Sequence, residues 1–261
     1  MNIAAAPTIT ALRREHDALA SLVATLSTEQ LTGPSGASEW TIADVLSHLG
    51  SGAEITLAFL RAASPGAEAP GPDLDQSVWD RWNALSPQDQ AAGFVQSDAA
   101  LVTALEAIPQ EQHEQLRLPT PLPEPVPLAT FVALRLSEVV PHHWDVRVGM
   151  DPAATLSEGS TGLLAKHLCT DLSFLLGWIG KPAEASEMGV LEVAQTPYRI
   201  VLDNMAQLTT QALPSTATFN GPLEAAVRLI YGRLTPAHTA NNIVVKGNMT
   251  LDDLRRAFPG F

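Results

Sequence analysis

The stretch that decides the fold lies just past the middle of the chain and reads LRLSEVVPHHWD, from Leu134 to Asp145. Within it, Glu138 and His142 are four residues apart, so a helix places both side chains on one face, one turn apart. A carboxylate and an imidazole arranged in this way suit a divalent cation. A third donor, His48, lies far upstream on a second predicted helix, in the segment WTIADVLSHLG from Trp40 to Gly50. This spacing predicts a metal site of two histidines and one glutamate inside a helical bundle.

The same residues have more ordinary explanations. A Glu and a His at positions i and i+4 also form exposed pairs that stabilise a helix by only about 0.2–0.5 kcal/mol. His48 alone is typical of a hydrogen-bonded core histidine. Three protein ligands leave the fourth position of a zinc site open, but the same ligands bind Ni²⁺, Co²⁺ and Fe²⁺, so they do not name the metal. His16, between Leu12 and Leu19 on an inward face, is a further candidate that we assign to the core or to a pocket wall.

Pro141 leaves two alternatives for the second histidine of the site. It stands directly before His142 inside a predicted helix, where it removes the hydrogen bond to the carbonyl of Ser137 and favours a kink. On a straight helix His143 points about 100° away from its neighbour. A kink would re-aim His142 or bring His143 to the metal. Asp145 either orients the imidazole of His142 as an outer partner or is an ordinary exposed helix carboxylate.

Apolar side chains recur at helical spacing along the N-terminal part of the chain. Two signals mark helix starts: Thr41 and Asp44 form a capping box, and Ser86 precedes Pro87 in a first turn. The proline-rich segment from Leu118 to Pro127 predicts an extended connector. The pattern predicts a four-helix bundle followed by a fifth, apolar helix, with helices near residues 8–27, 41–60, 86–108, 128–150 and 157–180.

The pattern changes after Pro182, where short predicted strands replace long helices. We expect strands at residues 198–202, 216–220 and 242–246, a helix at 224–233, and a last helix capped by Thr250. The sequence therefore predicts an α+β fold of two domains. The first is a mainly α bundle over residues 1–182, and the second is a small α+β domain over residues 183–261.

The composition favours a compact soluble protein of a reducing cytoplasm. The 261 residues are 46% hydrophobic, and 15 basic against 28 acidic residues give a net charge of −13. That charge repels phosphate groups, so we expect neither nucleic acid nor an anionic membrane as a partner. The single cysteine, Cys169, cannot form an internal disulfide and is expected to pack as a small apolar residue. We expect no signal peptide, because the N-terminal segment has no charged start and soon reaches Glu15 and Asp17.

Motifs in both parts of the chain together resemble a known family. The N-terminal part carries Trp40-Thr-x-x-Asp44-Val-Leu-Ser-His48-Leu and Glu138-x-x-x-His142-x-Trp144-Asp145. The C-terminal part carries Leu229-Ile-Tyr-Gly232-Arg233, Ile243-Val-Val-Lys-Gly247 and Leu251-Asp-Asp-Leu-x-x-x-Phe258-Pro-Gly260. In order and separation these motifs resemble the mycothiol-dependent maleylpyruvate isomerase family, within the wider DinB-like group of metal-binding four-helix bundles. The resemblance covers nearly the whole chain.

The resemblance implies a ligand set and a function. His48, Glu138 and His142 would bind a divalent metal, with zinc expected, and Arg233 would help to bind the substrate or the thiol. The co-substrate would be mycothiol, the low-molecular-weight thiol of actinobacteria, and the substrate a small electrophile.

The chemistry of a coordinated thiol agrees with this implied function. Such a thiol loses its proton and becomes a nucleophile at neutral pH. Its addition to an activated double bond, followed by rotation and loss of the thiol, would give isomerisation, whereas release of the adduct would give S-transfer. Arg233 would hold a carboxylate in bidentate fashion. Two alternatives stay open: a non-catalytic DinB-like protein that binds a metal or small ligand, and a partner-binding module without the metal.

Overall fold

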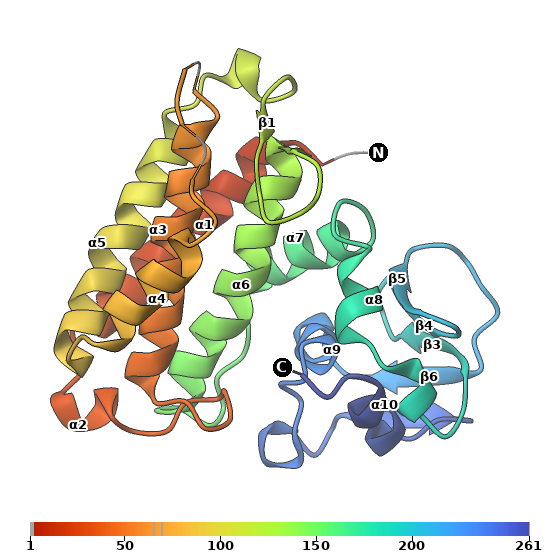
Figure 1. Ribbon diagram of the computed structural model, residues 1–261. Coiled ribbons are helices and arrows are strands. Elements are labelled where there is room, and N and C mark those ends of the chain that lie inside the picture. Colours follow the sequence, from red (N-terminus) through yellow and green to blue (C-terminus); the bar gives the residue numbers. More distant parts are fainter. Residues whose placement is uncertain (1–2, 65, 69, 261) are drawn as a thin grey trace. The chain divides into compact units, whose positions relative to one another are not determined.

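Figure 1 shows the computed structural model of the chain, which describes residues 3–64, 66–68 and 70–260. Of these, residues 4–154 form one compact unit, and residue 3 with residues 155–260 forms the other. The predicted boundary between residues 182 and 183 lies inside the second unit. The reason is that the two helices after residue 154 pack against elements of the C-terminal part.

Four long helices build the first unit, and they confirm the predicted bundle: α1 (Ala5–Val23), α3 (Ile42–Ala62), α5 (Pro87–Glu106) and α6 (Leu128–Val148). Both α1 and α3 pack against α5 and α6, so the four helices enclose one core (Figure 1). The shorter elements are α2 (Thr28–Leu31), α4 (Leu74–Asn83), the 3-10 helix η1 (Gln110–Gln112), β1 (Arg117–Leu118) and β2 (Val126–Pro127). The pairing of β1 with β2 joins the two ends of the proline-rich connector.

Side-chain caps set the starts of α3 and α5. Thr41 Oγ1 accepts a hydrogen bond from the backbone N–H of Asp44 at 3.1 Å, and Asp44 Oδ2 accepts one from the N–H of Thr41 at 2.9 Å. Ser86 Oγ accepts from the N–H of Asp89 at 3.2 Å, and Pro87 occupies the first turn. Both caps agree with the sequence prediction, and a cap of this kind contributes about 1 kcal/mol. The cap at Thr41 fixes the start of the helix that carries His48.

Trp82 ties α4 to the bundle. Its ring lies over Gly50 in the middle of α3, where an added Cβ would stand only 2.2 Å from the ring. A glycine inside a helix costs about 1 kcal/mol relative to alanine, and here it makes room for the indole. Trp82 Nε1 also donates a hydrogen bond to Glu54 Oε2 at 3.0 Å. These contacts hold α4, and with it Trp79, beside the part of α3 that carries His48.

The second unit is a small α+β arrangement. Its helices are α7 (Glu158–Leu168), α8 (Leu175–Ile179), α9 (Leu223–Ile230) and α10 (Leu251–Ala257), with 3-10 turns η2 (Pro182–Glu184) and η3 (Pro236–His238). Its strands are β3 (Gly189–Val193), β4 (Arg199–Leu202), β5 (Ala206–Thr209), β6 (Ala217–Asn220) and β7 (Val244–Gly247). They form one sheet in the order β5-β4-β3-β6-β7, in which β3 and β6 are parallel and the other pairs antiparallel.

The α+β fold class is confirmed, and β4, β6, β7, α9 and α10 lie where the sequence predicts them. Thr250 forms the predicted capping box with Asp253 at the start of α10. Strands β3 and β5 are not predicted, because neither carries a run of β-branched or aromatic residues.

The prediction of one continuous helix over residues 157–180 is wrong. The helix stops at Leu168, and a new one begins only at Leu175. The intervening turns contain Thr170, Asp171 and Ser173, whose short polar side chains compete with helical hydrogen bonds. Asp171 Oδ2 lies 3.1 Å from His167 Nδ1 and holds the first of these turns. Among the described residues no helix has the length and apolar character needed to cross a membrane.

Candidate metal centre

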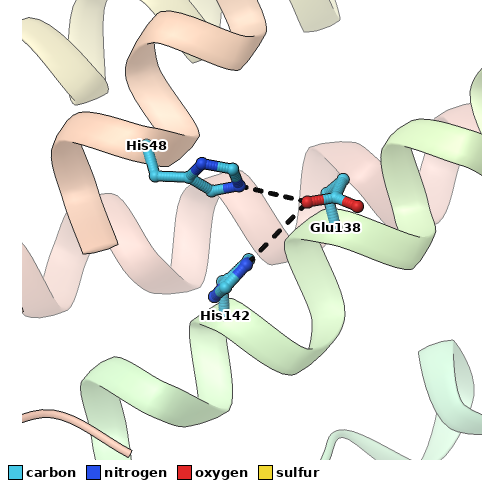
Figure 2. A group of neighbouring side chains, drawn as sticks. All are labelled: His48, Glu138 and His142. Carbon is cyan, nitrogen blue, oxygen red and sulfur yellow. Dashed lines mark hydrogen bonds and ion pairs between the residues drawn. The ribbon is translucent and has the colours of Figure 1, made fainter. Parts of the chain in front are cut away.

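Helices α3 and α6 bring His48, Glu138 and His142 together, and we call these residues the open cluster. Each offers one donor atom, and the three atoms lie within 4.8 Å of one another. Glu138 Oε2 is 3.1 Å from His48 Nε2 and 3.8 Å from His142 Nε2 (Figure 2). The separation of four residues on α6 therefore has the predicted result, with Glu138 and His142 pointing toward the same point.

Pro141 does not end α6, which runs without interruption from Leu128 to Val148. His142 faces the open cluster. His143 points elsewhere, and its Nδ1 lies 2.5 Å from Oε2 of the buried Glu15 on α1. Of the two alternatives that the sequence leaves, the structure thus places His142 with Glu138, and it pairs His143 inside the bundle.

Asp145 is the outer partner of His142. Its Oδ2 lies 2.9 Å from His142 Nδ1, and its side chain is fully buried. The alternative of an exposed helix carboxylate is therefore wrong. A buried carboxylate accepts a hydrogen bond here, which assigns a proton to Nδ1 of His142 and leaves Nε2 directed at Glu138.

The open cluster is reachable from solvent. The side chains of His48 and Glu138 are 36% and 50% exposed, whereas that of His142 is 11% exposed. Trp40 covers part of the site: its ring stacks on His142 at a centroid distance of 5.9 Å and lies 5.2 Å from the ring of His48. The two histidine rings are 4.7 Å apart and meet edge to face. The indole restricts both imidazoles while the carboxylate side stays accessible.

The pKa values at this site favour ligand-competent forms. Desolvation raises the pKa of Glu138, but the hydrogen bond to His48 and the charges of His142, His48 and Arg135 outweigh it and lower the pKa to about 2. For His142, desolvation lowers the pKa more than the interactions with Asp145 and Glu138 raise it. At neutral pH Glu138 is therefore a carboxylate and His142 is neutral, which are the forms that a metal requires.

Two cavities adjoin the open cluster and share His48 and Trp79 in their walls. We call them the polar cavity and the apolar cavity. The polar cavity has a volume of about 470 Å³ and is also lined by Trp40, Asp44, Ser51, Gln76 and Asn83. The apolar cavity has a volume of about 410 Å³, and Glu138 contributes to its wall. Ligands in both cavities would meet at His48.

A second polar cluster, which we call the closed cluster, lies inside the same bundle. Asp98 on α5 joins His16 of α1 to Arg135 of α6, with Oδ2 2.9 Å from His16 Nδ1 and Oδ1 accepting from Arg135 Nη2 at 2.8 Å. Arg135 Nη2 also donates to the carbonyl of Leu49 at 2.8 Å. His16 therefore has a core role. The sequence analysis did not find Asp98 or Arg135, because they lie on different predicted helices and no short motif links them.

Arg233 belongs to the second unit, directly after α9 and Gly232. It is buried, and its Nη1 donates to the carbonyl of Tyr231 at 2.8 Å. Gly232 adopts a positive φ of 71°, and an added Cβ would stand 2.3 Å from the Cα of Gly260. Glycine is thus required at position 232 by the backbone conformation and the close approach of Gly260. The role of Arg233 in ligand binding stays a prediction.

Cys169 follows directly after α7 and has the properties of a packed thiol. Burial raises the pKa of its thiol to about 11, so the thiolate is scarce. This agrees with the expectation that it packs as a small apolar residue.

Comparison with known proteins identifies the family. The family described as the mycothiol maleylpyruvate isomerase N-terminal domain matches residues 12–147, which include all of the open cluster. Two uncharacterized proteins of Mycobacterium tuberculosis, from strains CDC 1551 and H37Rv, are each 34% identical over 134 residues. The match covers 51% of this chain and 62% of each relative, which is less than two thirds of their length.

Solved structures show the same fold over a longer stretch. Two crystal structures of the mycothiol-dependent maleylpyruvate isomerase, one of them a histidine-to-alanine mutant, match with TM-scores of 0.65 and 0.66. The sequence identities are 18% and 17%, and each match covers 94% of this chain and 93% of the other. At such identity the likeness concerns the fold. With the family match over more than half of its length, this chain belongs to the mycothiol maleylpyruvate isomerase N-terminal domain family.

Proposed function

We propose that this protein is a metal-dependent enzyme that uses mycothiol to act on a small electrophile. His48, Glu138 and His142 would hold a divalent metal, with zinc as the expected ion. One observation carries the proposal: Nε2 of His142, whose Nδ1 is hydrogen-bonded to Asp145, faces Oε2 of Glu138 at 3.8 Å. Two lone pairs that converge in this way repel each other unless a cation lies between them.

The donor set fits such an ion. A tetrahedral zinc with bonds of about 2.0–2.1 Å has neighbouring ligand atoms roughly 3.4 Å apart. The distances from Glu138 to the two histidines, 3.1 and 3.8 Å, lie on either side of that value. Asp145 behind His142 supplies the outer carboxylate that commonly orients a metal-binding imidazole. Three protein ligands would leave one coordination position of the metal open.

Residues around the proposed metal would have separate roles in the reaction. When bound, the metal would lower the pKa of a thiol at the open position and so provide a nucleophile at neutral pH. Asp145 holds the tautomer of His142, and Trp40 shields the two imidazole rings from water. We assign to Arg233, on the family resemblance, the binding of substrate or thiol. Addition of the thiol to a double bond and its later loss would give isomerisation, whereas retention would give S-transfer.

The partners follow from the same proposal. They are mycothiol and a small electrophile, with no nucleic acid and no membrane, since the net charge of −13 disfavours anionic surfaces. The single cysteine favours a reducing cytoplasm as the compartment.

Metal analysis of the purified 261-residue chain tests the ligand set. We expect about one zinc ion per chain in the wild type and little metal in a His48→Ala variant. His113→Ala is the matched control, because His113 lies outside the open cluster and its Nε2 is 3.1 Å from the carbonyl oxygen of Ile108. Equal metal content in all three proteins would contradict the proposed site.

Turnover tests the reaction. The zinc-loaded protein is incubated with mycothiol and either maleylpyruvate or a generic electrophile, and product formation is followed. Metal binding without turnover of either substrate would favour a non-catalytic binding protein. Unchanged turnover in His142→Ala would refute the proposed role of the site even if activity were found.

A further inference from the structure

We propose that the apolar cavity beside the open cluster selects an uncharged, apolar electrophile. This inference rests on the proposed function and narrows its second substrate. It favours S-transfer to a neutral molecule over isomerisation of an anionic one.

The wall of the apolar cavity is built mainly from hydrophobic side chains. Helices α3, α4 and α6 and the proline-rich connector contribute Ile55, Phe59, Trp79, Pro121, Phe131 and Leu134. The volume of about 410 Å³ is large enough for a ring system of one or two aromatic rings. Burial of apolar surface contributes about 25 cal/mol per Å², so such a wall rewards a hydrophobic ligand.

The charges in this wall disfavour an anion. Its charged residues are Asp75, Arg135 and Glu138, of which two are carboxylates. Arg135 is the cation, but its side chain is only 4% exposed and its guanidinium already binds Asp98 and the carbonyl of Leu49. An anionic ligand would lie near the carboxylate of Asp75, and Nη2 of Arg135 already donates to Asp98 and to the carbonyl of Leu49. Leaving such a charge poorly paired costs several kcal/mol, which a neutral ligand avoids.

The polar cavity offers the opposite chemistry. Asp44, Ser51, Gln76 and Asn83 provide donors and acceptors, and Trp40 provides a flat ring. A hydrophilic thiol can satisfy its polar groups there and not against the apolar wall. His48 lines both cavities, so a thiol in one and an electrophile in the other would meet at the open cluster.

A matched pair of probes tests the inference on the full chain treated with a chelator and without thiol. The probes are nitrobenzene and 4-nitrobenzoate, which share a ring and a nitro group and differ in a carboxylate. Isothermal titration measures both dissociation constants. We expect nitrobenzene to bind at least about tenfold more tightly, equivalent to about 1.4 kcal/mol. Tighter binding of 4-nitrobenzoate, particularly if Arg233→Ala removes it, would overturn the inference.

Variants of the two cavities show which cavity binds the probe, and comparing them separates a local loss of affinity from a general loss of folding. Phe59→Ala and Leu134→Ala shorten half-buried side chains of the apolar wall and should each weaken nitrobenzene binding about five- to tenfold. Asn83→Ala, in the polar cavity, is the control and should leave that affinity unchanged. Thr56→Lys adds a cation at a half-buried position in the apolar wall and should shift the preference toward 4-nitrobenzoate. Equal losses in the two cavities, or no shift with Thr56→Lys, would overturn the inference.

The outcome is separable from that of the proposed function. Probe binding needs neither metal nor thiol, whereas the metal analysis of His48→Ala needs no electrophile. A chain that fails to bind zinc but prefers nitrobenzene would refute the metal centre and leave the cavity assignment standing. A chain that binds zinc but prefers 4-nitrobenzoate would support the metal centre and refute the cavity assignment.

Discussion

The open and closed clusters use similar residues in the same bundle, yet they differ in every property that matters for ligand binding. In the closed cluster each oxygen of Asp98 has a partner, and one partner is a guanidinium. In the open cluster Glu138 faces two imidazoles, is half exposed, and has no cation bonded to it among the described residues. Helix α6 contributes Arg135 to one cluster and Glu138 to the other, only three residues apart.

This difference shows how α6 can contribute both to stability, through Arg135, and to ligand binding, through Glu138. A carboxylate that is buried with a cation and fully hydrogen-bonded is internally neutralised and has nothing to offer a ligand. A carboxylate that converges with two imidazoles at an accessible surface, with no Lys or Arg bonded to it among the described residues, offers a site for an added cation. The closed cluster should therefore respond to mutation through stability, and the open cluster through metal content and activity.

The largest effect should come from breaking the closed cluster. Asp98→Ala leaves the buried guanidinium of Arg135 without its carboxylate, which typically costs about 3–5 kcal/mol of unfolding free energy. Urea denaturation of metal-free protein measures this loss. Asp17→Ala, at an exposed position on α1, is the control and should change stability by less than about 0.5 kcal/mol. If Asp98→Ala lowered the unfolding free energy by less than about 1 kcal/mol, the closed cluster would not have the stabilising role that distinguishes it from the open cluster.

The next effect should come from the open cluster and appear in a different measurement. Glu138→Gln removes the anionic ligand, and the loss of a metal worth several kcal/mol in the transition state should lower turnover at least about 100-fold. The unfolding free energy of the metal-free protein should change by less than about 1 kcal/mol, since solvent screens a half-exposed carboxylate. Full turnover with normal zinc content in this variant would show that the two clusters do not differ as argued.

A smaller effect on metal affinity is expected from Asp145, the hydrogen-bond partner of His142. Asp145→Asn keeps an acceptor for Nδ1 of His142 but removes the negative charge, and changes of this kind reduce metal affinity about 10–100-fold. Competition with a zinc chelator of known affinity measures the change. Asp75→Asn serves as the control, because Asp75 lines the apolar cavity without being bonded to a ligand histidine. If both variants bound zinc equally well, Asp145 would have only a structural role.

The sequence was most informative where local rules decide the structure. The capping box at Thr41, the proline start at Pro87 and the apolar periodicity predict the long helices, since each signal lies within a few residues. Glu138 and His142 could be paired for the same reason. His48 was added as a third donor from another predicted helix, and the family resemblance supported this choice, because no local rule relates residues on different helices.

Other features depend on tertiary packing and could not be predicted. Asp98 meets His16 and Arg135 only because three helices pack together, and the burial of Asp145 is a property of the folded bundle. The break between α7 and α8 reflects a choice between helical bonds and side-chain bonds near Asp171. Strands β3 and β5 gain their stability from their neighbours in the sheet and not from intrinsic propensity.

The smallest expected effect is a change of stability with pH. It tests whether Asp98 in the closed cluster is stabilised as a carboxylate. Burial raises the pKa of Asp98, but the hydrogen bond with His16 and the charge and hydrogen bond of Arg135 outweigh it, so the pKa is lowered in the folded protein. A carboxyl with a lowered folded pKa stabilises fully above its unfolded pKa of about 3.9, and this contribution is lost as the pH falls through the folded value.

The variant Asp98→Asn keeps the shape of the side chain and removes its titration. The difference in unfolding free energy between wild type and Asp98→Asn should therefore shrink as the pH falls below about pH 4. Denaturation curves at several pH values measure it, and the other carboxylates cancel because both proteins contain them. A difference that grew as the pH fell would mean that burial dominates and that Asp98 is not neutralised by Arg135. The closed cluster would then resemble the open one in needing an external cation.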